Sequence, residues 1–179
     1  MTQTAKVYGG SLYGLAKDEG VSADIMSELD AVADIFRDNP RYLDLLVLPS
    51  LPKEERCSFL DESFKGQVHQ YLLNFLKILV ENGTIGEYFG CVEAFRESYY
   101  RDNGICAVTC ISALPLSDEL CDKLRIKLGN MTGKTIVLTV KVDPSVLGGI
   151  KLYMNGNSYD GTVASRLSEV QSLLFDTVL

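Results

Sequence analysis

Histidine is almost absent from this sequence of 179 residues, in which His69 is the only one. A metal site with two histidine ligands, or a catalytic site that needs two imidazoles, is therefore excluded. His69 falls in a segment with a helical pattern, where a lone histidine usually has a structural role. No other motif in the chain indicates catalysis, so we expect no catalytic residue and no bound metal or cofactor.

Cysteine is scarce and its count is odd, with Cys57, Cys91, Cys106, Cys110 and Cys121 spread over the middle of the chain. This usage predicts thiols in a reducing compartment rather than a disulfide framework. Cys106 and Cys110 have a spacing found in some metal sites, but they fall in a strand pattern. Four residues of strand span about 13 Å, which is too long for one disulfide or one zinc ion.

Long apolar runs are missing as well. No stretch reaches the roughly eighteen apolar residues that are typical of a transmembrane helix. The first segment, MTQTAKVYGG, has neither the apolar core of a signal peptide nor the arginines of a transit peptide. We therefore expect a protein that stays where it is made and does not insert directly into a membrane.

Positive charge is scarce in the first part of the chain. Up to Ile105, 10 Lys and Arg residues stand against 17 Asp and Glu residues, whereas from Cys106 onward the count is 7 against 7. An acidic surface repels phosphate groups, which argues against nucleic acid and against docking on an anionic membrane. We expect no nucleic-acid partner.

The sequence does contain many apolar residues in helical spacing. Hydrophobic residues make up 46% of the chain, which is enough for a packed core. Up to about residue 101 their spacing predicts six helices, separated by glycine, proline and asparagine. The most apolar one covers residues 68–80, VHQYLLNFLKILV, and a helix that is apolar nearly all round is central in a bundle.

The pattern changes from a period near 3.6 to a period of 2 at residues 102–104, DNG. After this point, strands are predicted at 105–111, 134–142, 150–154 and 158–160. A helix after Ser117, with Leu120 among its inward residues, and a last amphipathic helix from Thr162 complete this part. We predict an α+β protein, in which a six-helix bundle (1–103) precedes a small α/β domain with a mixed sheet (104–179).

The segment YGGSLYG, residues 8–14, carries three glycines within one predicted helix. A phosphate-binding loop needs G-x-x-x-x-G-K-[ST] after a strand, but Leu15 follows Gly14 and no strand precedes the segment. In a helix the three glycines cost about 3 kcal/mol relative to alanines. Their lack of bulk lets another helix approach closely, and that neighbour is either internal or supplied by a partner.

The segment VDPSVLGG contains a second glycine pair, Gly148 and Gly149. No helix follows these glycines, so no helix dipole favours an anion there, and Asp143-Pro144 is typical of a turn. Asp143 and Asp160 could pass for a catalytic carboxylate pair. Without a second histidine or a metal cluster, we interpret them as turn and cap residues.

Four stretches in order along the chain resemble one known family. They are YGGSLYGLA, NFLKILVENG, AVTCISALPLSDEL and VDPSVLGGIKLYMNGNSYDGTVASRLSEV. Together they resemble the delta subunit of F-type ATP synthase, the relative of the mitochondrial oligomycin-sensitivity-conferring protein. The most specific stretch is similar to the family's strand-turn-strand and helix-start signature, here formed by Asp143, Pro144, Gly148, Gly149, Asp160 and Gly161.

This resemblance implies a non-catalytic stator subunit that links the catalytic head of the synthase to its membrane sector, so that ion flow is coupled to ATP synthesis. It implies that the C-terminal domain contacts the peripheral-stalk b subunits, at the cytoplasmic face of the cell membrane. It also implies that the bundle holds the N-terminal helix of an alpha subunit between its first and fifth helices. We expect the residues that line or support this groove to be Tyr8, Leu12, Leu15, Leu72, Phe75, Ile78 and Leu79.

Two departures from the family pattern accompany the resemblance. Thr84 stands where the family usually has Arg, and Gly9 and Gly10 stand where alanines or other residues are usual. Two alternatives from other classes are an unrelated acidic adaptor or regulatory helical bundle, and a small-molecule enzyme that uses the α/β part. Copurification with a synthase head distinguishes the first alternative, and a ligand-dependent thermal shift tests the second.

Overall fold

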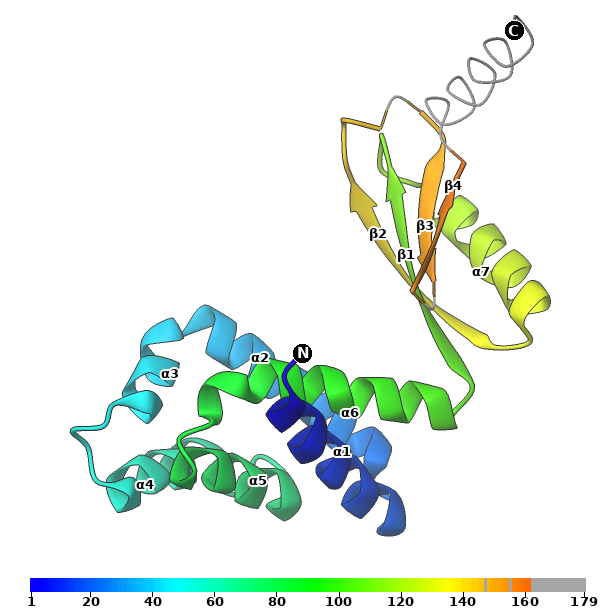
Figure 1. Cartoon of the computed structure of the whole chain (residues 1–179). Helices are drawn as coiled ribbons and strands as arrows, with labels where there is room; N and C mark the ends of the chain where they lie inside the picture. Colours follow the sequence, from blue (N-terminus) through cyan, green and yellow to red (C-terminus); the bar gives the residue numbers. More distant parts are fainter. Residues whose placement is uncertain (147, 155, 162–179) are drawn as a thin grey trace, which may run out of the picture. The chain divides into compact units, whose positions relative to one another are not determined.

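The computed structural model of the chain describes residues 1–146, 148–154 and 156–161, and it is an α+β protein with a mixed sheet, as the sequence predicts (Figure 1). Its contacts divide the chain into two compact units, Met1–Tyr99 and Tyr100–Leu179. The helix predicted from Thr162 onward lies outside the described residues.

The first unit is helical. Its helices are α1 (Gln3–Asp18), α2 (Ser22–Asp38), α3 (Pro40–Val47), α4 (Lys53–Phe64), α5 (Gln70–Glu81) and α6 (Tyr88–Asp102), which continues past Tyr99. A 3-10 turn at Ile85–Glu87 precedes α6. His69 is not within α5 but caps its start, because its Nδ1 accepts a hydrogen bond from the Tyr71 amide at 3.3 Å. The helix α2 begins at Ser22, and Val21 precedes it as the cap residue.

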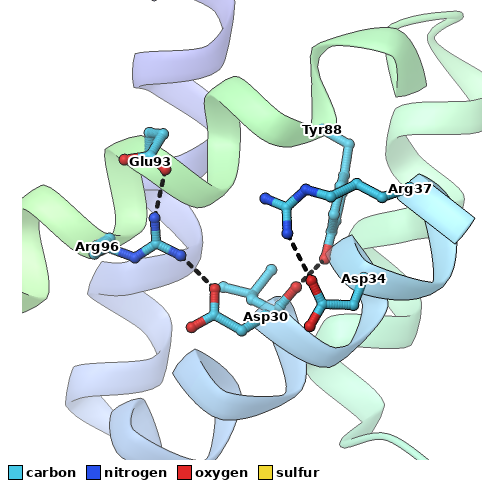
Figure 2. A network of polar contacts seen from close by, with 7 residues as sticks. Asp30, Asp34, Arg37, Tyr88, Glu93 and Arg96 are labelled. Atoms are coloured by element: carbon cyan, nitrogen blue, oxygen red, sulfur yellow. Dashed lines mark hydrogen bonds and ion pairs between the residues drawn. The ribbon is translucent and has the colours of Figure 1, made fainter. Parts of the chain in front are cut away.

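Aromatic packing and one ion-pair network hold α2 against α6. The Tyr88 ring is fully buried against Phe36, with 5.0 Å between ring centroids, and its hydroxyl donates to the Leu29 carbonyl oxygen at 2.8 Å. Figure 2 shows Arg96 of α6 between Asp30 of α2 and Glu93 of its own helix, bonded to both. Arg96 is partly buried, and its two carboxylate partners keep its charge from being left unpaired there.

Glycine allows α1 to cross α6 at very short range. A Cβ atom at Gly9 would lie 2.3 Å from the Cys91 carbonyl oxygen and 2.8 Å from the Ala94 Cβ. One turn away, a Cβ at Gly90 would lie 2.9 Å from the Ala5 Cβ. The close neighbour that the glycine-rich segment predicts is therefore, for Gly9, an internal helix.

In the described part of the second unit, the helix α7 lies on a four-stranded sheet (Figure 1). Its elements are β1 (Ile105–Ser112), α7 (Asp118–Thr132), β2 (Thr135–Val142), β3 (Ile150–Met154) and β4 (Asn157–Asp160). The strand order is β2-β1-β3-β4, with β1 parallel to β2 and antiparallel to β3. Cys106 and Val108 of β1 are buried under Leu128 of α7, whereas Leu120, expected to face inward, is 52% exposed.

Candidate functional site

An apolar groove runs between α1 and α5 in the first unit. It encloses about 520 Å³. Five of its lining residues come from α1 and four from α5: Val7, Tyr8, Ser11, Leu12, Leu15, Tyr71, Asn74, Phe75 and Ile78. They recur every three or four residues, so they form one face on each helix.

The base of the groove is buried, but its upper walls are not. Leu12 and Phe75 are 5% and 6% exposed and join the core of the unit. Val7, Leu15 and Ile78 are 55%, 42% and 43% exposed, although each is a large apolar side chain. Single exposed apolar residues are ordinary on protein surfaces, but a contiguous set that lines a concavity marks an interaction site.

Hydrogen bonds at the two ends of α5 connect it to α1 and to α2. At its end, the Asn82 side-chain amide donates to the Tyr8 hydroxyl at 3.2 Å. At its start, the His69 backbone N–H donates to a carboxylate oxygen of Glu28 in α2 at 2.8 Å. The single histidine thus helps to set the geometry of the groove without contributing to its surface.

Five of the seven predicted groove residues line this concavity, namely Tyr8, Leu12, Leu15, Phe75 and Ile78. Leu72 and Leu79 are completely buried, so they can support the groove from beneath but do not line it. The sequence reasoning missed Val7, Ser11, Tyr71 and Asn74. Val7 and Ser11 lie on the same helical face as Leu15, at intervals of four residues. Extending that face from Leu15 towards the start of α1 would have identified them.

Gly10 and Gly14 differ from Gly9 in their surroundings. A Cβ atom at either position would meet no atom within 4 Å. Their lack of a side chain therefore is not explained by packing within the chain. On a helical wheel Gly14 is adjacent to Val7, at the solvent side of the groove.

The lining of the groove offers no catalytic group. Its lining contains no acid, base or thiol, and among the described residues there is no group of three or more His, Cys, Asp or Glu side chains that could hold a metal. Elsewhere in the unit, burial, followed by the Glu87 charge, raises the pKa of the Cys91 thiol to about 11, which disfavours the nucleophilic thiolate. Such a site can bind the apolar face of a helix.

The signature residues of the second unit form turns and strand ends. The Asp143 carboxylate accepts from the Ser145 amide at 2.9 Å, and hydrogen bonding to the Ser145 side chain, followed by this backbone bond, lowers the pKa of Asp143. Gly148 and Gly149 have φ angles of 139° and 85°, a region that favours glycine. Asp160 in β4 lies 3.9 Å from the Lys151 ammonium, and the Gly161 amide donates to the Ile150 carbonyl at 3.0 Å.

The first unit is helical and has an open apolar groove, and it is joined to a small α/β unit; a groove supplied by two adjacent helices is the kind of surface that can receive the apolar face of a helix. The family model of the ATP synthase delta (OSCP) subunit matches residues 4–174, so the chain belongs to this family. It is therefore a component of the peripheral stalk of F-type ATP synthase and not itself an enzyme. Family membership rules out both alternatives, the unrelated adaptor and the small-molecule enzyme.

Curated relatives match over nearly the whole chain. The chain is 30% identical to an ATP synthase subunit delta of Halalkalibacterium halodurans, over 91% of this chain and 90% of the relative. It is 27% identical to an ATP synthase subunit delta of Clostridium kluyveri, over 93% of this chain and 92% of the relative.

A solved structure shares the fold. It is one chain in the cryo-EM structure of the Toxoplasma gondii mitochondrial ATP synthase hexamer, with a TM-score of 0.78, 18% identity and 98% of each chain covered. Within the part of our chain that the structure describes, no helix has the length and apolar character needed to cross a membrane.

Proposed function

We propose that the groove between α1 and α5 holds the N-terminal helix of an alpha subunit, and that the helices α1 to α6 act as one six-helix bundle for this purpose. The exposure of Val7, Leu15 and Ile78 around a buried apolar base is the observation that carries the proposal. An amphipathic helix that binds in a groove needs an apolar strip supplied by two adjacent helices.

Calorimetry with the alpha-subunit N-terminal peptide from the same organism tests this function. We expect one peptide to bind per chain, with a negative heat-capacity change because apolar surface is buried. A peptide of the same composition in scrambled order, which has no apolar stripe, is the matched control. Equal binding of the two peptides, or no binding of either, would refute the proposal.

The second unit is proposed to contact the peripheral-stalk b subunits. An apolar concavity of about 310 Å³ between α7, β3 and β4 supports this role, because Met131 and Tyr159 at its surface are 74% and 51% exposed.

We further propose that residues 1–103 and 104–179 are separate domains. A chain ending at residue 103 should keep its helical circular dichroism and its alpha-peptide binding while losing binding to b.

The proposed location is peripheral, at the cytoplasmic face of the cell membrane, within the assembled synthase.

The isolated chain should neither bind nor hydrolyse ATP. Nucleotide binding requires a loop whose backbone N–H groups hold the phosphates together with a lysine, and no loop of this sequence has that pattern. Membranes depleted of this subunit should retain ATPase activity in the detached head but lose ion-driven ATP synthesis. Normal synthesis in such membranes would contradict the coupling role.

A further inference from the structure

We infer that Cys110 of β1 and Cys121 of α7 form a modification site, at which a low-molecular-weight disulfide such as oxidised glutathione converts the two thiols into a reversible internal disulfide. Both cysteines are free thiols in the structure. The inference concerns the second unit, so it does not depend on the groove between α1 and α5 or on the partner proposed for it.

Cys110 lies on the face of β1 that α7 covers. Burial alternates along this strand, and its buried residues are Cys106, Val108, Cys110 and Ser112. Cys106 and Val108 pack with Leu128 of α7, so the buried face is the one beneath the helix. Cys110 shares that face and is 0% exposed.

Cys121 lies on the face of α7 that packs on the sheet. Leu124 and Leu128 of this helix belong to the apolar cluster of the second unit. Cys121 precedes them by three and seven residues, a spacing that places all three on one helical face. Cys121 is partly buried, whereas its neighbours Leu120 and Asp122 are exposed, as this assignment requires.

The course of the chain brings the two thiols to the same level. The helix α7 connects the parallel strands β1 and β2, so it runs in the opposite direction to both, and its start lies near the end of β1. Cys121 is about 10 Å from Leu128 along the helix, and Cys110 is about 13 Å from Cys106 along the strand. Since Leu128 packs with Cys106, Cys121 comes to lie over Cys110.

The electrostatics of Cys110 agree with this placement. Burial, followed by the charge of Cys121, raises the pKa of the Cys110 thiol. A charged group shifts the pKa of another in this way at short range. The raised pKa also keeps Cys110 in the less reactive thiol form, so Cys121 is the residue that meets an oxidant first.

The reaction proceeds by two exchange steps. The Cys121 thiolate attacks one sulfur of oxidised glutathione, which forms a mixed disulfide and releases one glutathione. The Cys110 thiolate then attacks the Cys121 sulfur, and the second glutathione leaves. The two protons lost by the protein thiols end on the two glutathione thiols, so two cysteines are oxidised while one disulfide is reduced. The product ties α7 to β1 covalently.

Peptide mapping by mass spectrometry tests the inference on the folded full chain after treatment with oxidised glutathione. We expect a linked Cys110–Cys121 peptide that lacks two hydrogen atoms and that dithiothreitol separates again. Cys121→Ser and Cys110→Ala should each remove this peptide. Cys106→Ser is the matched control and should retain it, because Cys106 lies on the same face but about 13 Å from Cys110, too far for a disulfide.

The stability of the oxidised chain provides a second measurement. Cys121 follows Cys110 by eleven residues, so the bond closes a short loop and restricts the unfolded chain. The Tm of the wild type should rise by about 5 to 10 °C on oxidation, and that of Cys121→Ser should not.

Three results would overturn the inference. A mixed disulfide that stays on Cys121 and never passes to Cys110 would mean that the two sulfur atoms do not meet in the folded chain. A linked peptide that forms only in urea would mean that the unfolded chain makes the bond. A fall in Tm on oxidation would mean that the bond distorts the native packing of α7 on β1.

Discussion

The two sides of α1 differ sharply in how the chain covers them. On the side facing α6, a Cβ at Gly9 would lie only 2.3 Å from backbone, so the helices approach as closely as a missing side chain permits. On the groove side, Val7 and Leu15 keep about half of their side-chain surface exposed. The chain therefore covers one side of α1 with α6, here called the closed side, and leaves the groove side exposed, here called the open side. The difference supports the proposal that a partner covers the open side.

The largest expected effect comes from disturbing the closed side. Gly9→Val should lower the free energy of unfolding by about 3 kcal/mol, because the new side chain meets the Cys91 carbonyl oxygen, a backbone atom that cannot easily move. Urea denaturation measures the change. Gly10→Val is the matched control, since the same side chain enters open space on the same helix. Equal losses in both variants would mean that helix propensity alone explains the effect.

Disturbing the open side should affect binding and not folding. Ile78→Asp places a charge at the apolar contact and should weaken alpha-peptide binding about thirty-fold, or about 2 kcal/mol. Thermal unfolding of the free chain should stay nearly unchanged, because Ile78 is 43% exposed. Ile35→Asp on α2, where the side chain is 42% exposed, is the control and should bind normally. Unchanged affinity of Ile78→Asp in calorimetry would remove this residue from the site.

The free energy of unfolding should also depend on pH through Cys91, which lies on the side of α1 that faces α6. Burial raises the pKa of the Cys91 thiol from 9.0 to about 11, so the folded state disfavours the thiolate. The raised pKa gives a contribution to stability that is fully present below about pH 9 and is lost as the pH rises towards 11. Between these values the wild type should lose up to about 2 kcal/mol more than Cys91→Ala does. Parallel urea-denaturation curves for the two proteins across this range would contradict the assignment.

The smallest expected effect is a change in stability at Gly10, which lies in open space where Gly9 does not. Gly10→Ala should raise the free energy of unfolding by up to about 1 kcal/mol, because alanine favours a helix and its Cβ meets no atom here. Differential scanning calorimetry should show a modest rise in Tm. A fall in Tm would mean that α1 is packed on this side too, and that the comparison between its two sides is wrong.

Much of the fold follows from local patterns. The change of period after Arg101 predicts where strands begin, and the stripes of α1 and α5 identify five of the residues that line the groove. The sequence could not separate Gly9 from Gly10 and Gly14, because only the position of α6 decides which glycine is crossed. It also left Leu72 and Leu79 among the groove candidates, since a helix that is apolar nearly all round does not reveal which of its faces is covered.

The ends of the elements were harder to predict for a related reason. His69 continues the apolar pattern of α5, but its ring accepts a hydrogen bond from the Tyr71 amide, so it caps the helix instead. Leu120 has the spacing of an inward residue on α7 and yet is exposed, whereas Leu124 and Leu128 of the same helix pack against the sheet. Spacing identifies a face, whereas burial depends on what the rest of the chain brings to it.

Methyl NMR of the full chain, titrated with the alpha-subunit N-terminal peptide, tests the central claim most directly. The account predicts that the methyl resonances of Val7, Leu15 and Ile78 shift together and saturate at one peptide per chain. The methyl resonance of Ile126, which is 64% exposed on α7, should remain unchanged. Shifts centred on the second unit, with the three groove residues unaffected, would contradict the claim that the groove between α1 and α5 is the binding site.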